Sequence, residues 1–209
     1  IVSAGTLRLP EPGTTPVAGS ILWLDASMLS LADGADVTQL DDRSATGNNA
    51  IPSDSGNPPT FNADGLIGLG TVHFAETTQG LVTLGDLDIS GDQDRSIFAV
   101  MRRDNGSLAV QTGDAGTLYH GYGITSQADG LWVPYTVGVG GVTIDARPIG
   151  VYELYDVLHK HGIPTSDGGT NYGYVNGVLV GMNGNTPDIN TDIAPLKIGF
   201  VSDNSEPSG

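Results

Sequence analysis

The residues that are best suited by type and spacing to bind an ion form an acidic run near the middle of the chain. Oxygen-bearing side chains stand there at alternate positions: Asp86, Asp88, Ser90, Asp92 and Asp94. With Gly91 in sixth place, the run is like the start of a calcium loop, because Ca²⁺ prefers several carboxylate and carbonyl oxygens. Ile97 stands where such a loop has its closing bidentate glutamate. The run therefore predicts either a Ca²⁺ site or a solvated acidic turn.

Paired carboxylates of the kind that cleave glycosidic bonds are not evident. The nearest arrangement is Glu153 and Asp156, in a strand-like segment. Residues three apart on a β-strand point to opposite faces, so these two carboxyls would not meet. Cysteine nucleophiles are excluded because the chain has no cysteine, and no nucleophile-elbow motif is present. The residues predict a protein that is not an enzyme.

Two histidines, His159 and His161, would share one face of a strand, a geometry that could hold a transition-metal ion. Two ligands are too few for such a site, and the sequence offers no evident third. We interpret them as a pair at a strand edge or in a loop.

The elements that must position these residues are almost all β-strands. Short segments rich in β-branched and aromatic residues alternate with turns marked by 31 glycines and 12 prolines. Strands are predicted at 21–24, 71–74, 80–84, 96–102, 108–111, 116–122, 131–139, 142–146, 151–159, 172–175, 178–182 and 196–201. Asn176 and Gly177 favour a tight hairpin, because both tolerate positive φ angles, and Asn183-Gly184 is expected to end the next strand. One helical turn is expected at 27–31, with Ser27 as its N-cap.

This succession of short strands, without strand–helix–strand spacing, predicts the fold class. We expect an all-β protein built as a two-sheet antiparallel sandwich. A chain of 209 residues is long enough to bury a core without disulfides.

Charge limits the partners that the chain can have. The 24 acidic residues outnumber 8 basic ones, which gives a formal net charge of −16. Such a surface repels phosphate backbones, so no nucleic-acid partner is expected. No apolar run approaches the ~20 residues of a membrane span, so no membrane insertion is expected. Divalent cations and neutral glycans remain compatible.

Several segments, in order, resemble one family. They are 22–27 (LWLDAS), 31–34 (LADG), 42–50 (DRSATGNNA), 59–61 (PTF), 72–74 (VHF), 96–100 (SIFAV) and 174–178 (YVNGV). The chain resembles the laminin-G-like domains of the concanavalin A-like lectin/glucanase superfamily, which implies a jelly-roll sandwich. We expect an N-terminal arm at 1–19, the sandwich at 20–201 and a polar tail at 202–209. Trp23 is expected to anchor the core, and Asp42 to accept hydrogen bonds within a polar turn where Gly47 and Asn48 tolerate positive φ.

The resemblance also suggests sites. It implies a glycan platform built from aromatic residues, for which the candidates are Trp132, Tyr135, Tyr119, Tyr122 and Tyr172. Each could equally pack in the core. The closing strand that such domains carry after 196–201 is not found, so an open sheet edge is expected to be filled by the N-terminus, by another chain or by a segment missing from this sequence. The apolar residues suited to that role are Ile1, Val2, Leu7 and Leu9.

Together these features predict a non-catalytic module on an extracellular or virion surface. The favoured function is a structural subunit, such as a virion decoration, fibre or extracellular filament protein, assembled with other protein chains as a homo-oligomer or larger assembly. The alternative is a lectin-like module that recognises a glycan or a protein, with or without Ca²⁺ as its only cofactor. A glycoside hydrolase ranks third.

Overall fold

The computed structural model describes residues 18–75, 78–91, 93–104, 108–113, 121–127, 130–133, 142–144, 147–162, 169–186 and 193–199. In these ranges the regular secondary structure is β-strand, apart from one turn of 3-10 helix, η1 (Ala26–Met28). No helix among them is long and apolar enough to cross a membrane. The chain divides into two compact units, the first made mainly of residues 88–194 and the second of residues 6–87 with 195–200.

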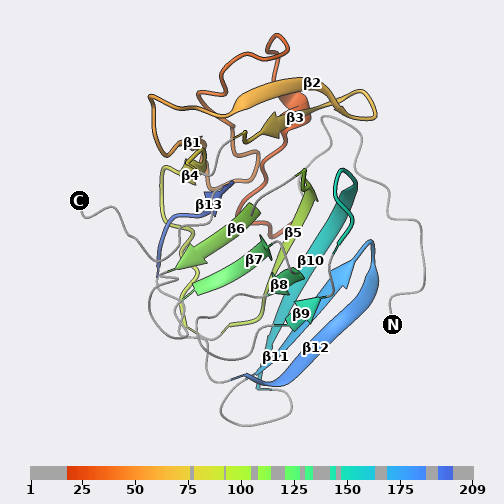
Figure 1. The fold of residues 1–209 in the computed structure, drawn as a ribbon. Coiled ribbons are helices and arrows are strands. Elements are labelled where there is room, and N and C mark those ends of the chain that lie inside the picture. The colour runs from red at the N-terminus through yellow and green to blue at the C-terminus, as the bar shows by residue number, and fades with distance from the viewer. Residues whose placement is uncertain are drawn as a thin grey trace. The chain divides into compact units, whose positions relative to one another are not determined.

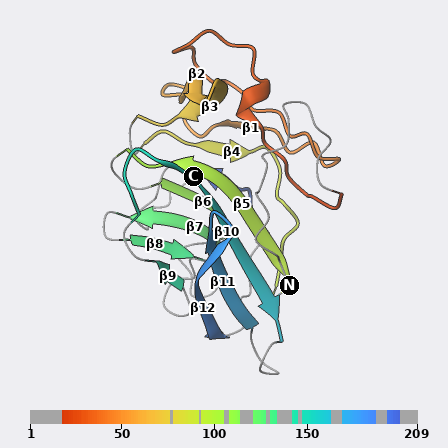
Figure 2. The same cartoon turned by 90° about the vertical axis from the view of Figure 1, so that its right-hand side faces the viewer.

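The first unit is a sandwich of two antiparallel layers (Figures 1 and 2). One layer has the strand order β12-β11-β10-β5, with bounds β5 (Arg95–Arg102), β10 (Tyr152–His161), β11 (Gly169–Val175) and β12 (Val178–Thr186). The other has the order β6-β7-β8-β9, with bounds β6 (Leu108–Gly113), β7 (Gly121–Gln127), β8 (Gly130–Val133) and β9 (Val142–Ile144). The layers touch where β9 meets β11 and β12 and where β7 meets β10. The predicted all-β, two-sheet antiparallel sandwich is confirmed.

Side chains that alternate along β10 build the core of this unit. Tyr155 and Val157 point inward and are at most 6% exposed, and Tyr122 and Ile124 of β7, in the other layer, are at most 1% exposed. The Tyr122 hydroxyl donates to the Val157 carbonyl across the layers at 3.3 Å. A buried phenol needs such a partner, so this bond fixes how the layers face each other.

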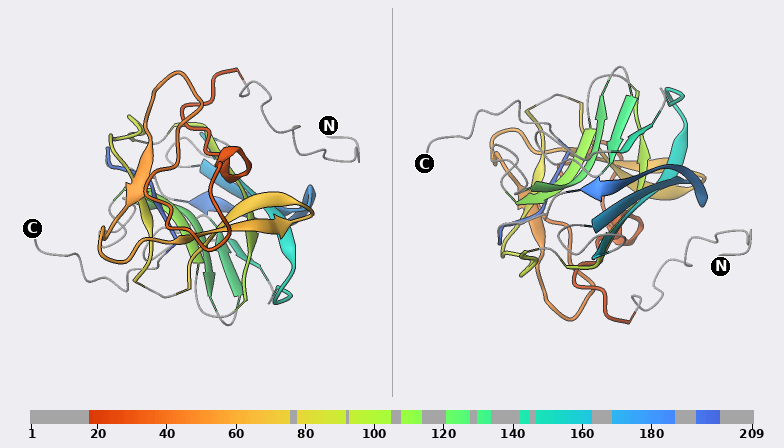
Figure 3. Two further views of the ribbon diagram at one scale, coloured as in Figure 1. Left: turned by 90° about the horizontal axis from the view of Figure 1, so that it is seen from above. Right: turned by 90° about the horizontal axis from the view of Figure 1, so that it is seen from below.

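The second unit contains two groups of paired strands. One has the order β1-β4-β13, with bounds β1 (Ala50–Pro52), β4 (Leu81–Thr83) and β13 (Lys197–Ile198); the other is the hairpin of β2 (Thr60–Leu66) and β3 (Leu69–His73), seen from above in Figure 3. Leu40, Ala50 and Leu81 form the core. Gly70 is required because a Cβ there would lie 2.4 Å from the Phe61 ring.

The predicted polar turn is present in this unit, with Asp42 at its centre. The Asp42 carboxylate accepts from the backbone amides of Trp23 and Ser44, each at 2.9 Å, and from the Thr46 hydroxyl at 2.8 Å. Partial burial acts to raise the pKa of Asp42, but these hydrogen bonds outweigh it and lower the pKa to about 2. Gly47 has a φ of 72° and Asn48 donates its backbone N–H to Asp42. Asp42 therefore ties the segment before η1 to the turn.

Other local predictions have mixed outcomes. The hairpin at Asn176 and Gly177 is confirmed, with φ angles of 51° and 77°. Asn183 does not end its strand, because β12 continues to Thr186. The helical turn is capped by Asp25, whose carboxylate accepts from the Ser27 amide, and not by Ser27. Trp23 is only half-buried, outside any regular strand.

The predicted boundaries of arm, sandwich and tail stay predictions. Residues 1–17 and 200–209 lie outside the described residues, and with them Ile1, Val2, Leu7 and Leu9.

Candidate functional site

The outward side of the sheet β12-β11-β10-β5 is the candidate site. On β10 the odd-numbered side chains from Glu153 to His159 are buried, and the even-numbered ones are half-buried on the opposite face. We call that opposite side the outer face, and define it by Phe98, Val100, Leu154, Asp156, Leu158, Tyr172, Tyr174, Leu179 and Met182. Cross-strand partners share a face, so the register brings these nine side chains together.

Asp156 lies at the centre of the outer face. It is paired with Phe98 on β5 and with Tyr174 on β11. Directly opposite residues have Cβ atoms about 5 Å apart, so both rings flank the carboxyl. Leu154 and Leu158, two positions away on β10, enclose it along the strand direction. One carboxyl therefore stands within a ring of aromatic and aliphatic side chains.

The outer face exposes an unusual amount of apolar surface. Phe98 and Met182 are each 65% exposed, and Leu179 is 48% exposed. Scattered exposed apolar residues are ordinary, but a contiguous group on one sheet face marks a binding surface. Both tyrosines of β11 on this face, Tyr172 and Tyr174, are half-buried and supply flat rings beside the exposed side chains.

The Asp156 carboxyl has no compensating partner among the described residues. Its Oδ1 is buried, and no hydrogen-bond donor reaches it. Burial raises the pKa of Asp156 from 3.8 to about 6. A buried acceptor without a donor costs free energy, and such groups are found where a ligand or functional role explains them.

In the described part of this sheet, cations lie only at the two ends of the outer face, and each is already engaged. Arg102 pairs with Asp104 at 2.7 Å and covers the Tyr152 ring at 5.2 Å. Lys160 pairs with Asp94 at 2.6 Å. These ion pairs leave Asp156 without a neutralising charge.

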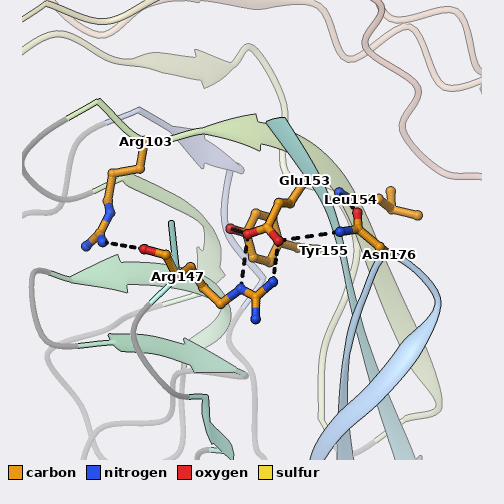
Figure 4. A network of polar contacts seen from close by, with 6 residues as sticks. All are labelled: Arg103, Arg147, Glu153, Leu154, Tyr155 and Asn176. Atoms are coloured by element: carbon orange, nitrogen blue, oxygen red, sulfur yellow. Dashed lines mark hydrogen bonds and ion pairs between the residues drawn. The ribbon is translucent and has the colours of Figure 1, made fainter. Parts of the chain in front are cut away.

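The buried side of β10 has a separate polar network, shown in Figure 4. Glu153 forms a two-pronged ion pair with Arg147 and accepts from the Tyr155 hydroxyl at 2.9 Å. Asn176 donates to Glu153 and accepts from the Leu154 amide, which ties the hairpin turn to β10. Burial acts to raise the pKa of Glu153, but its donors hold it below the usual value. With its carboxylate satisfied, this network stabilises the fold and leaves no reactive group free.

Glu153 and Asp156 lie on opposite faces of β10, as their spacing predicts. The two histidines, His159 and His161, lie in different environments. His159 is fully buried, with its Nδ1 2.7 Å from Asn171 Oδ1, whereas His161 is exposed.

The calcium prediction remains untested. Among the residues that the structure describes, no group of three or more His, Asp or Glu side chains could hold a metal ion. Asp92 lies outside them, and Asp94 is engaged by Lys160 and by the His161 amide. Asp88 has a φ of 53°, as expected of a turn.

The predicted aromatic platform is placed only in part. Tyr172 lies on the outer face, but Tyr122 is 1% exposed in the core, which corrects its interpretation as a ligand platform. Tyr119 and Tyr135 lie outside the described residues, and Trp132 lies on β8, where the backbone alone is described. Phe98 and Tyr174 were missed, and Asp156 was considered only as half of a carboxylate pair. Alternation along 95–102 and 152–161 is a signal that could have placed Phe98 and Asp156 on faces of their strands.

Comparison with known proteins yields likeness in structure alone. No family model and no curated protein matches the chain. Domain 4 of AbnA, an extracellular GH43 arabinanase from Geobacillus stearothermophilus solved with arabinotriose, has a TM-score of 0.53 at 17% identity, over 80% of this chain and 85% of that one.

Two alginate lyases match at lower similarity. Aly36B has a TM-score of 0.41 at 11% identity, over 87% of this chain and 85% of that one. The lyase vAL-1 from Chlorella virus has a TM-score of 0.35 at 14% identity, over 82% and 84%.

The likeness to the AbnA domain shows a shared β-sandwich fold, the fold class that the sequence predicts. It also corrects the prediction that the chain is not an enzyme. The AbnA domain is part of an extracellular arabinanase, so this fold occurs within an enzyme.

Proposed function

We propose that this chain recognises a polysaccharide, which it binds along the outer face of the sheet β12-β11-β10-β5. The observation that carries the proposal is the outer face itself, where Phe98, Tyr172 and Tyr174 surround the unpartnered carboxyl of Asp156. Sugar rings present apolar C–H surfaces and hydroxyl donors together. Flat aromatic side chains suit the first, and a carboxylate acceptor suits the second.

The fold neighbour supports the same ligand class. Domain 4 of AbnA was solved in complex with arabinotriose, and it belongs to an extracellular enzyme. We propose an extracellular setting for this chain as well, and membership of the laminin-G-like group within the concanavalin A-like sandwiches.

A binding assay on single variants tests the proposal. The chain is run by affinity electrophoresis in gels that contain a polysaccharide, or is titrated with soluble polysaccharides, from a panel that includes arabinan. We expect at least one ligand whose affinity falls about tenfold or more in Phe98→Ala and in Tyr174→Ala. Leu84→Ala is the matched control, because Leu84 is a large apolar side chain that is 61% exposed, similar to Phe98, but belongs to the second unit. Retention of full affinity in both aromatic variants would refute binding on the outer face.

Assembly with other chains is a second candidate, favoured by one observation. In the sheet order, β5 lies at an edge, and its eight residues include the exposed Phe98. Long edge strands pair readily with further strands. Light scattering after size exclusion tests it: a monomer at all concentrations would remove this candidate, and an oligomer dissociated by Ser96→Pro, at a residue whose N–H faces away from β10, would support it.

A further inference from the structure

The central carboxyl of the outer face has no counter-charge within the described part of the chain. Asp156 is flanked by Phe98 and Tyr174 across the strands and by Leu154 and Leu158 along β10. None of these four side chains is a cation. A carboxylate that is partly desolvated gains most from a partner that is both a donor and positively charged.

The side chains around Asp156 would also accept such a partner. An ammonium group is attracted to the faces of aromatic rings, and Phe98 and Tyr174 stand on both sides of the carboxyl. A neutral hydroxyl would satisfy Oδ1 but would gain little from these rings.

The charge of the whole chain acts in the same direction. With 24 acidic and 8 basic residues, the chain repels polyanions such as uronate polymers and attracts polycations. The cations at the ends of the outer face, Arg102 and Lys160, are each paired with an aspartate, so they would not hold an anionic sugar in place of a cationic one.

We propose that the glycan bound on the outer face is an amino-sugar chain, with one protonated amine seated on Asp156 between Phe98 and Tyr174. This inference rests on the proposed function, since it names the chemical class of ligand for the same surface.

The proposal implies a defined pH dependence. Asp156 must be ionised and the sugar amine protonated, so binding should strengthen as pH rises through about 6 and weaken again where the amine loses its proton. Among the described residues, the other titratable or charged side chains on this side of the sheet are Arg102, Tyr152, Lys160, Tyr172 and Tyr174, with Asp104 and Asp94 paired to the two cations at the ends, and Asp156 is the carboxyl at the centre. The rising limb is therefore assigned to Asp156.

Calorimetric titration with two matched probes tests the inference. The probes are a fully deacetylated glucosamine hexasaccharide and its N-acetylated counterpart, which differ in charge and not in backbone. We expect the deacetylated probe to bind at least tenfold more tightly, and Asp156→Asn to abolish that preference and the rising limb near pH 6. Asp41→Asn is the control, since it removes the same charge from an exposed residue of the second unit.

Different outcomes separate the two proposals. Binding of neutral glycans through Phe98 and Tyr174 without preference for the amine would overturn this inference and leave the proposed function standing. Absence of binding to every glycan in the wider panel would remove the proposed function itself. An oligolysine peptide that binds as tightly as the sugar, and equally through Asp156, would overturn the inference in favour of a basic protein partner.

Discussion

At the scale of single residues, Asp156 is a source of instability in the free protein. Its pKa is raised by burial to about 6, so folding disfavours its charged form. The free-energy penalty is absent below pH 4, grows between pH 4 and 6, and is complete above pH 6. Asp156→Asn should therefore raise the free energy of unfolding at pH 8 by about 1–2 kcal/mol, allowing for partial exposure. Urea denaturation at pH 8 measures the gain.

The same experiment at pH 3.5 is the control for Asp156, because at that pH the folded parent and the folded variant both have a neutral side chain at this position. The variant and the parent should have closely similar stability there. A variant that is less stable than the parent at pH 8 would mean that the carboxylate has a favourable partner, which contradicts the role assigned to it on the outer face.

Asp42 has the opposite effect on stability. Its folded pKa is lowered to about 2, so its contribution is fully present above pH 4 and is lost as pH falls from 4 towards 2. Asp42→Asn should cost about 2 kcal/mol at pH 7, since it weakens several charge-assisted hydrogen bonds at once. Thermal unfolding followed by circular dichroism would show the loss. The variant should also lack part of the parent's acid sensitivity below pH 4, and an unchanged acid transition would contradict this account.

At the scale of elements, the hairpin between β11 and β12 depends on its turn. Gly177 has a φ of 77°, and a Cβ there would meet no other atom within 4 Å. Gly177→Ala therefore introduces backbone strain without a clash, and should destabilise the protein by about 1–2 kcal/mol. Gly56→Ala is the matched control, because Gly56 is exposed and does not have a positive φ. Equal effects of the two substitutions in chemical denaturation would refute the argument from the turn.

The local pattern predicts these elements well where the pattern itself is strong. The predicted strand at 151–159 corresponds to β10, and the predicted strand at 96–102 to β5, each within a few residues. β2 was missed, because its central sequence, NADG, has little strand character and is held in place by pairing with β3. The apolar run at 21–24 was overestimated, since only Leu24 forms a bridge, to Asp42.

The candidate site was harder to predict than the strands, for a physical reason. Alternation places Asp156 on a face of β10, but only the register with β5 and β11 places Phe98 and Tyr174 beside it. Those pairings join residues 58 and 18 positions apart, and no local preference sets them. The aromatic residues that the sequence offered as a platform were chosen by type alone, and Tyr122 shows the consequence, since it lies in the core.

At the scale of the whole molecule, the dominant property is the excess of negative charge. Each of the 8 basic residues can offset one of the 24 acidic residues, which leaves a net charge of −16. Pairs such as Arg102 with Asp104 are exposed and contribute little to stability. Self-repulsion should therefore outweigh local attraction at neutral pH and low ionic strength.

Salt provides the test of that balance. Raising ionic strength from about 10 mM to 150 mM shortens the Debye length from about 30 Å to about 8 Å, which screens repulsion between distant carboxylates more than contacts within one ion pair. We expect the melting temperature at pH 7 to rise by a few degrees over this range, and to rise less at pH 4, where part of the charge is neutralised. Sodium chloride is used because chloride has few cationic sites to occupy on this chain. A melting temperature that falls with salt would mean that attraction within ion pairs outweighs the repulsion between carboxylates.

The same screening should weaken the attraction of an amino-sugar chain to the outer face, so stability and affinity are expected to respond to salt in opposite directions.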